Sequence, residues 1–262
     1  MPAPIVFTDA AAYDRSIGAW SAATGADFLD WLAPPPGLRW LDVGCGSGVF
    51  TTLLAERAAP AALCGIDPEP AQLAFAARRP ALAGAVLQQG DAMALPAADA
   101  AFDAAVMALV IFFVPDPARG LAEMRRAVRP GGLVAAYAWD IPHGGFPSDP
   151  VQQALRQVTG AEPSFPPHAA IATPEALGAL WRAGGLAEVE AISLRTERHF
   201  PDFATFWAQA SGFGAAAAAL AALTPAARAA VEAETRARVR IAADGRVSHT
   251  ATASAVRGIR PG

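Results

Sequence analysis

Leu41-Asp42-Val43-Gly44-Cys45-Gly46-Ser47-Gly48 is the stretch that decides the fold of this chain. It ends a strand-like apolar run from Leu38 to Val43 and leads into a helical pattern from Val49 to Arg57. Three glycines within five residues let the backbone turn sharply and leave room for a ligand against the main chain. The pattern therefore predicts a strand, a ligand-binding glycine turn and a helix.

A second strand with an acidic end follows the glycine turn. The apolar run from Ala61 to Ile66 is followed directly by Asp67. A glycine turn with an acidic residue about 20–25 positions further on is how an α/β sheet holds an adenosine ribose by its two hydroxyls. The spacing indicates a cofactor of the nucleoside type.

The details of the turn discriminate between cofactors. A dinucleotide fingerprint requires Gly-x-Gly-x-x-Gly, but its last position is Val49 here and the third glycine comes one residue early, at Gly48. No lysine follows, so the turn is not a phosphate-binding P-loop. A nicotinamide-dependent oxidoreductase is the less favoured alternative.

The arrangement Asp-x-Gly-x-Gly-x-Gly resembles motif I of the class I S-adenosylmethionine-dependent methyltransferases, in particular the small-molecule type with a methyltransferase-11-like domain. Three further segments strengthen the resemblance, which covers roughly residues 38 to 140. Gly65 to Pro68 resembles the ribose-binding strand end, and Gly90 to Pro96 resembles the adenine-binding segment. Phe102 to Val106, continuing to Val128 to Gly132, resembles the fourth strand, its helix and the turn into strand five.

The fold follows from the alternation of strands and helices through Asp140, which is typical of βαβ units and a parallel sheet. The resemblance implies an α/β fold: a doubly wound, Rossmann-like, mostly parallel seven-stranded sheet with an antiparallel last strand. We expect three parts: a helical segment over the cofactor site (1–37), a core (38–200 plus 246–262), and a helical cap inserted between strands six and seven (201–245).

The later elements are predicted from local patterns. Apolar periodicity predicts a helix from Pro117 to Val128, and the continuous apolar run from Ala104 to Val114 predicts a strand buried on both faces. Thr173 with Pro174 predicts the start of another helix. The remaining predictions are a helix over Trp20–Leu32, a turn over Arg129–Gly132, and strands over Leu133–Trp139, Glu188–Phe200 and Arg246–Arg257.

Cofactor contacts at the methionine end are implied by the resemblance. The turn from Gly44 through Cys45 and Gly46 to Gly48 would approach the methionine part of S-adenosyl-L-methionine. Asp42 would act on the ammonium group, directly or through water. The alternative for an isolated aspartate is that it caps a turn or a helix.

At the adenosine end, the resemblance implies that Asp67 binds the ribose hydroxyls, for which its two acceptor oxygens are suited. Pro68 and Met93 would flank the adenine, while Asp91 and the backbone of Ala92 would meet its polar edge. Ala108 and Leu109 would border the same crevice, and S-adenosyl-L-homocysteine would be the product.

Methyl transfer requires little of the protein beyond positioning of the two reactants and exclusion of water. A base is needed only where the acceptor carries a proton. His143, just after strand five and close to Asp140, is the best-placed candidate, the alternative being an exposed loop residue. The hydroxyl of Tyr13 could touch the sulfonium region or the acceptor, or the residue could simply anchor the N-terminal helix.

Aromatic segments suggest an apolar acceptor site. Ile111 to Phe113 falls where many relatives carry polar residues, which indicates an apolar wall near the methyl group. Phe203, Phe206 and Trp207 have the spacing of a helix core, and one or two could also face substrate. A small, largely hydrophobic acceptor is expected, with an oxygen, nitrogen or carbon atom as the target. A cofactor-binding protein without turnover remains an alternative.

Composition limits the other partners. The 262 residues are 53% hydrophobic and 17% charged, and the net charge of −4 with no run of Lys or Arg argues against a nucleic-acid substrate. We expect no secretory signal, no membrane span, a cytoplasmic location, and a monomer or homodimer. Cys45 and Cys64 give no disulfide framework, and scattered histidines give no metal site.

Overall fold

The computed structural model of the chain describes residues 17–162, 165–212 and 214–262. Its strands are β1 (Arg39–Val43), β2 (Ala62–Asp67), β3 (Val86–Gln89), β4 (Phe102–Ala108), β5 (Val128–Trp139), β6 (Ala187–Phe200), β7 (Arg240–Ile241) and β8 (Val247–Ile259). They form one sheet in the order β3-β2-β1-β4-β5-β8-β6, and β7 pairs with β8 outside this path. The two-residue β7 is one strand more than the seven predicted.

Helices connect these strands. The α-helices are α2 (Ala19–Leu32), α3 (Val49–Arg57), α4 (Pro70–Ala76), α5 (Pro117–Ala127), α6 (Asp149–Thr159), α7 (Pro174–Ala183), α8 (Phe203–Ser211), α9 (Gly214–Ala221) and α10 (Pro225–Arg238). Short 3-10 helices are η2 (Pro80–Leu82), η3 (Ile111–Phe113), η4 (Ile141–His143) and η5 (Ala169–Ile171). The hydroxyl of Thr173 accepts a hydrogen bond from the amide of Ala176 at 3.2 Å and caps α7, as predicted.

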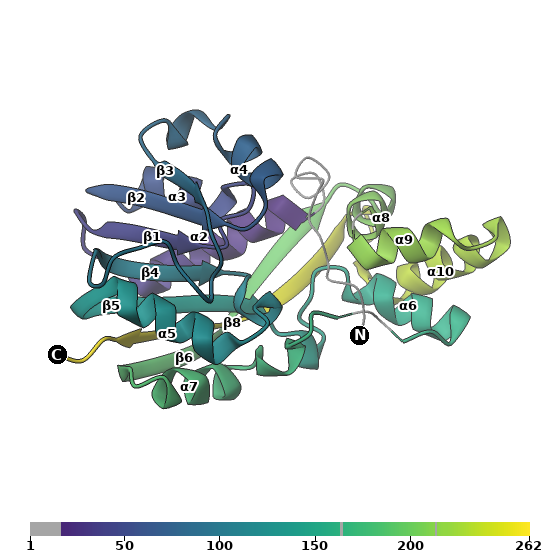
Figure 1. Cartoon of the computed structure of the whole chain (residues 1–262). Helices are drawn as coiled ribbons and strands as arrows, with labels where there is room; N and C mark the ends of the chain where they lie inside the picture. Colours follow the sequence, from purple (N-terminus) through teal and green to yellow (C-terminus); the bar gives the residue numbers. More distant parts are fainter. Residues whose placement is uncertain (1–16, 163–164, 213) are drawn as a thin grey trace.

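The direction of the strands confirms the predicted fold class. β1 to β5 pair in parallel, whereas β8 runs antiparallel to both β5 and β6. α2 and α3 pack on one face of the sheet, and α5 and α7 lie on the other (Figure 1). Because both faces are covered, the central strands carry apolar side chains such as Trp40, Leu41 and Val106, all of which are fully buried.

Two strand boundaries differ from the predictions. The apolar run to Val114 does not remain extended: β4 ends at Ala108, and Leu109 adopts a left-handed φ of 62° before η3 begins. β5 starts five residues early, at Val128, and includes the predicted turn. Its pairing with β4 skips from Val128 to Leu133, so the glycines of the turn form a bulge rather than a break.

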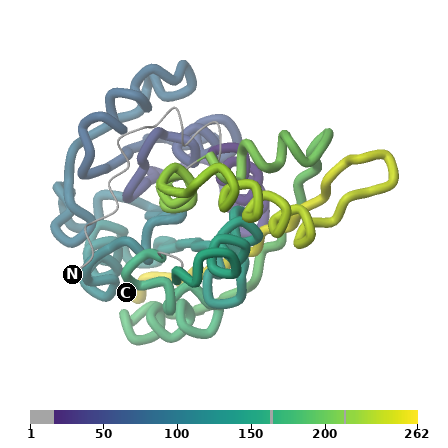
Figure 2. The backbone as a smooth tube through the Cα atoms, turned by 90° about the vertical axis from the view of Figure 1, so that its right-hand side faces the viewer, coloured from purple at the N-terminus to yellow at the C-terminus, as the bar shows by residue number. Residues whose placement is uncertain are grey.

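The segment between β6 and β8 contains α8, α9 and α10. Figure 2 looks onto the end of the molecule where α6 lies, and there these helices lie beside α6. Both α9 and α10 contact α6. Helices that follow different strands therefore meet beyond the same edge of the sheet.

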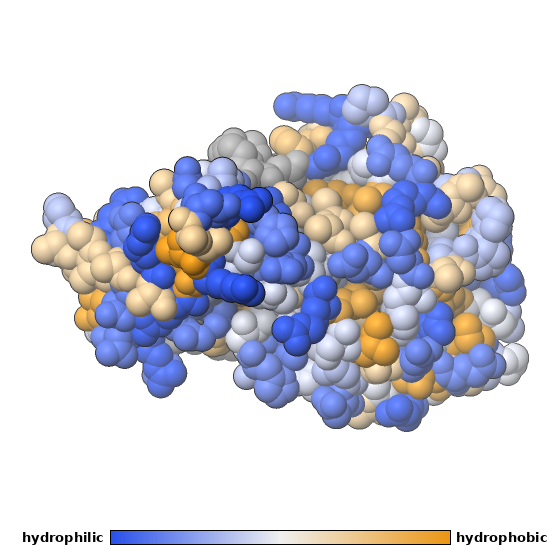
Figure 3. All heavy atoms as spheres, turned by 180° about the vertical axis from the view of Figure 1, so that it is seen from behind, coloured by the Kyte–Doolittle hydropathy of each residue, from blue (hydrophilic) through white to orange (hydrophobic). Residues whose placement is uncertain are grey.

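The surface carries few large apolar side chains. Figure 3 shows hydrophilic residues interspersed with small hydrophobic patches on the face opposite to Figure 1. Val86 and Phe165 are the exposed large hydrophobic residues identified among those that the structure describes. Within these same residues, no helix has both the length and the apolar character needed to cross a membrane. They also bring together no group of three or more His, Cys, Asp or Glu side chains suited to a metal ion.

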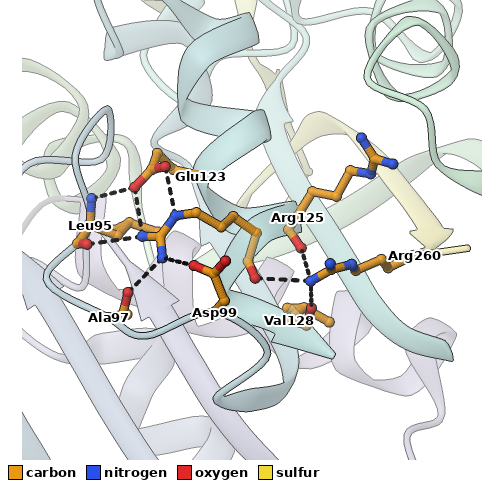
Figure 4. Close-up of polar contacts among 8 residues, drawn as sticks. Leu95, Ala97, Asp99, Glu123, Arg125, Val128 and Arg260 are labelled. Atoms are coloured by element: carbon orange, nitrogen blue, oxygen red, sulfur yellow. Dashed lines mark hydrogen bonds and ion pairs between the residues drawn. The ribbon is translucent and has the colours of Figure 1, made fainter. Parts of the chain in front are cut away.

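A hydrogen-bond network ties the segment after β3 to α5 (Figure 4). The guanidinium group of Arg126 donates to the carbonyl oxygens of Leu95 and Ala97, at 3.1 and 2.7 Å, and to the carboxylates of Asp99 and Glu123. Glu123 also accepts from the amide of Leu95 at 2.9 Å. Two carbonyl groups of an irregular segment are thus satisfied by one side chain.

We expect Arg126→Met to lower the free energy of unfolding by about 2 kcal/mol, because the carbonyl and carboxylate acceptors lose charge-assisted donors. Urea denaturation would measure this effect. Arg125→Met is the matched control, since the main-chain oxygen of Arg125, not its side chain, takes part in the neighbouring bond with Arg260. Equal stability losses in the two variants would contradict the anchoring role of Arg126.

Candidate functional site

A cavity of about 630 Å³ lies at the carboxyl ends of β1, β2, β4 and β5. The strand order reverses between β1 and β4, which is where open α/β sheets bind their ligands. Eight residues of the predicted cofactor set line the cavity: Asp42, Gly44, Cys45, Gly46, Asp67, Pro68, Ala108 and Leu109. The sheet topology therefore brings most of the predicted residues to one place.

The glycine turn is held to the next strand by backbone bonds. The amides of Gly44 and Cys45 both donate to the carbonyl oxygen of Ile66, at 2.7 and 3.0 Å. Gly44, Gly46 and Gly48 all adopt positive φ angles, of 77°, 52° and 80°. Such angles favour glycine, so the sequence pattern is explained by the conformation of the turn.

The three glycines face different surroundings. A Cβ on Gly44 would stand 2.5 Å from Val110, and one on Gly48 would stand 2.8 Å from Leu82. No atom of the described residues lies within 4 Å of the position that a Cβ on Gly46 would take. Gly46 therefore offers bare main chain to the cavity, whereas Gly48 packs against the protein interior and is not among the lining residues.

Asp67 closes the site at the end of β2. Its Oδ2 accepts a hydrogen bond from the amide of Gly46 at 2.8 Å, and its Oδ1 accepts from the amide of Glu69 at 2.9 Å. Burial raises the pKa of this carboxyl, the two amide bonds oppose that shift, and the charge of Glu69 adds to it. Each oxygen keeps further acceptor capacity, so the carboxylate can bind hydroxyl groups while it remains fixed.

Asp42 is fully buried behind the turn. Its Oδ2 accepts a hydrogen bond from the Thr51 hydroxyl at 2.7 Å, but its Oδ1 has no partner among the described residues. Burial raises the pKa of Asp42 to about 7, the Thr51 bond lowers it, and the charge of Asp67 raises it further. The buried carboxylate of Asp42 therefore keeps one oxygen that no described residue satisfies.

Several other predicted residues lie elsewhere. Asp91 accepts a hydrogen bond from the amide of Met93 at 2.8 Å and pairs with Ala94, so it caps a turn. Asp91, Ala92 and Met93 do not line the cavity. Tyr13 lies outside the described residues.

His143 does not line the cavity. Its Nδ1 lies 2.9 and 3.0 Å from the two oxygens of Asp140, which is the partner that the sequence suggested. The imidazole is nevertheless 66% exposed, and the cavity is lined by Ile141 of the same 3-10 helix instead.

The apolar side of the cavity includes Phe112 and Phe113, as predicted for the segment after β4. Phe203, Phe206 and Trp207 are buried and do not line it; Phe203 stacks on Trp207, while Phe206 packs on Phe200. The inserted helices contribute small residues instead, and these are Ala210, Gly212, Gly214, Ala215 and Ala216.

Sequence reasoning missed two groups of lining residues. Tyr137 and Trp139 stand two positions apart on β5 and so share one face of the strand. Ser148 and Gln152 come from the start of α6. Alternation along the predicted fifth strand could have identified the aromatic pair, whereas no local pattern indicates the pair on α6.

Residues 41–136 match the family model of a methyltransferase domain. An uncharacterized methyltransferase of Mycobacterium bovis is 37% identical over 145 residues, which are 52% of this chain and 55% of that protein. An uncharacterized protein in a transposon of Streptomyces fradiae is 38% identical over 136 residues, 50% of this chain and 39% of its own length. The chain thus spans about half the length or less of these curated relatives.

Solved structures share the fold over most of the chain. A putative methyltransferase of Bacillus halodurans superposes with a TM-score of 0.59 at 13% identity and covers 91% of this chain and 99% of its own. A phosphoethanolamine N-methyltransferase of Haemonchus contortus in complex with S-adenosyl-L-methionine superposes with a TM-score of 0.56 at 16% identity. It covers 100% of this chain and 62% of its own.

Residues 41–136 of the chain form a methyltransferase domain. This family and its structural neighbours support S-adenosylmethionine as the cofactor of the domain. The close packing of the site can be tested by adding side chains to the glycine turn of the methyltransferase domain.

We expect Gly44→Ala to destabilise the methyltransferase domain more than Gly37→Ala does. Both glycines have φ near 80°, so each variant incurs a left-handed penalty of about 1–2 kcal/mol. The Cβ at position 44 also meets Val110, whereas no atom in the described part of the chain lies within 4 Å of a Cβ at position 37. Thermal and urea unfolding would compare the two, and equal losses would contradict close packing of the turn.

The raised pKa of Asp42 predicts a pH dependence of stability. The folded methyltransferase domain holds this proton more tightly than the unfolded chain, so Asp42 makes folding less favourable as pH rises from about 4 to about 7. The free energy of unfolding, relative to that of Asp42→Asn, should fall by up to about 1.4 kcal/mol per pH unit in that window. Urea titrations at several pH values would measure the difference, and a pH-independent difference would contradict it.

Proposed function

We propose that the chain is an S-adenosylmethionine-dependent methyltransferase that moves a methyl group to a small, largely apolar metabolite. The observation that carries the proposal is the contact between Asp67 and the Gly46 amide at 2.8 Å. A carboxylate suited to ribose hydroxyls thus lies beside bare glycine main chain, in a cavity whose other side is apolar.

The residues present fit the cofactor. The Asp67 carboxylate is suited to the ribose hydroxyls, and Pro68 lines the cavity next to it. The open space at Gly46 leaves room for the methionine part against the turn. The unpartnered Oδ1 of Asp42 supports its predicted role toward the ammonium group, directly or through water. Asp91, Ala92 and Met93 have weaker support at the adenine, because they stand outside the cavity lining.

When bound, the cofactor supplies a methyl group on a positively charged sulfur, which an acceptor lone pair takes over as the carbon–sulfur bond breaks. The chain contributes position and exclusion of water. Phe112, Phe113 and Trp139 provide an apolar wall on which an acceptor of similar character can pack. The protein then needs no nucleophile of its own.

The need for a base depends on the acceptor. An acceptor that carries a proton requires a base within hydrogen-bond reach. Asp140 orients His143, but the imidazole ring is mostly exposed. Catalysis by positioning of the two reactants, without a base, therefore has the better support. A role of Tyr13 remains a hypothesis from sequence.

The inserted helices support a cap over the acceptor side. The proposed unit 201–245 contributes Ala210 and Ala216 to the cavity, and Ile17 and Ser21 do the same from the end of segment 1–37. A cap assembled from two insertions would shield the reacting atoms from water.

Two alternatives have less support. A nicotinamide-dependent oxidoreductase needs a glycine where Val49 stands, and the matching family model is that of a methyltransferase domain. A cofactor-binding protein without turnover would use the same cradle, and only product formation separates it from an enzyme.

We expect Asp67→Asn to weaken binding of S-adenosyl-L-homocysteine by about 10- to 100-fold, the value of a charge-assisted hydrogen bond. Isothermal calorimetry would measure it, with Asp244→Asn in the turn between β7 and β8 as the matched surface control. Undiminished affinity in Asp67→Asn, or binding of NADH in place of the homocysteine product, would refute the proposed cofactor site.

Turnover is tested in the same preparation. Release of S-adenosyl-L-homocysteine with a panel of phenols, amines and carboxylic acids would establish the enzyme and the acceptor atom. A His143→Ala variant with unchanged kcat would exclude His143 as the base, whereas a loss of kcat without a change in cofactor affinity would assign the base to it.

A further inference from the structure

A second groove adjoins the cavity. It has a volume of about 780 Å³ and runs along α6, with Arg238 of α10 on its wall. Ile141, Gln152 and Phe165 line both spaces. These three side chains therefore form the partition between the enclosed cavity and the outer groove, and a ligand that passes the partition would occupy both.

Gln152 stands at this partition with an unmet hydrogen bond. Its Oε1 is buried and has no partner within the described residues. An unpaired buried acceptor is unfavourable, and a hydroxyl or N–H group of a ligand would satisfy it. Rotation of the amide about its last torsion can present either the oxygen or the NH₂ group to such a ligand.

The charged groups of the groove already have partners. Arg156 lies 3.0 Å from the carboxylate of Glu162, and Arg238 lies 2.5 Å from that of Glu234. The carboxylate of Asp149 accepts a hydrogen bond from the side-chain Nε2 of Gln153 at 2.5 Å. An anionic or cationic ligand group would have to displace one of these partners, whereas a neutral hydroxyl can add to them.

Phe165 adds an apolar surface at the same place. Its side chain is 39% exposed, although it borders both the cavity and the groove. Amide groups, paired charges and an open aromatic ring together match a ligand that has hydroxyl groups on its rim and C–H groups on its face. A sugar ring has both, whereas a purely apolar chain lacks the hydroxyl groups.

We propose that the groove binds a neutral, hydroxyl-rich appendage of the methyl acceptor, such as a sugar, while the apolar part of the acceptor enters the cavity. This inference rests on the proposed function, since the cavity must hold the cofactor and the reacting end of the acceptor. Gln152 is then a specificity-determining residue at the junction of the two parts.

The experiment uses matched pairs of phenolic aglycones and their monoglucosides as probes. Wild-type protein saturated with S-adenosyl-L-homocysteine is incubated with the mixture, and retained compounds are quantified by affinity-selection mass spectrometry. We expect glucosides to be retained about 10-fold or more above their aglycones, and Gln152→Leu to reduce that preference.

A bulky substitution isolates the groove. Gln153 is an exposed residue of α6 on the groove wall, so Gln153→Trp would fill the groove and abolish the preference for glucosides while leaving aglycone retention unchanged. Ala229→Trp, at an exposed position of α10 outside the groove lining, is the control and should behave as wild type.

Three results would overturn the inference: no retained glucoside, equal retention of both members of each pair, or full retention of glucosides by Gln153→Trp. Preference for sulfated over glucosylated probes would indicate an anionic ligand and also overturn it. Affinity for S-adenosyl-L-homocysteine is measured first by calorimetry in every variant. If wild-type protein does not bind S-adenosyl-L-homocysteine, the proposed function itself is refuted. Failure of the proposed function is therefore distinguishable from failure of the groove inference.

Discussion

The site depends on one hydrogen bond between neighbouring strand tips, from the Gly46 amide to the Asp67 carboxylate. β1 and β2 pair in parallel with Asp42 opposite Gly65, so the turn after β1 and the acid at the end of β2 emerge side by side. Two further amides of the turn bond to Ile66, one residue before Asp67. The conformation of the turn and the position of the carboxylate are therefore set together.

This arrangement stores unfavourable electrostatics in the free protein. Asp42 and Asp67 are both buried, and burial raises the pKa of each. The hydroxyl of Thr51 and the amides of Gly46 and Glu69 offset only part of that cost. A ligand that carries positive charge at the sulfur and at the ammonium group would relieve the remainder. Under the proposed function, part of the stability lost on folding would be regained as binding energy for such a ligand.

The glycine turn and the strand end beside it could be predicted from the sequence because their determinants are local. The φ angles of Gly44, Gly46 and Gly48 and the placement of Asp67 at a strand end are encoded within a few residues. The prediction from local sequence was wrong for one apolar run, because an apolar run is compatible with more than one structure. Residues 104–114 read as one buried strand, but the chain leaves the sheet at Leu109, and apolar periodicity does not separate a buried strand from a buried turn.

The acceptor side could not be predicted in this way, because tertiary packing assembles it from α6, α9 and the end of β5. The alanine run of α9 shows the difficulty. As a sequence it indicates helix propensity and nothing more. In the structure, Ala215 and Ala216 border the cavity, where their small side chains leave space instead of making a contact. The proposed cofactor contacts thus depend on groups that are present on β1 and β2, whereas the space left beside them depends on side-chain volume that α9 lacks.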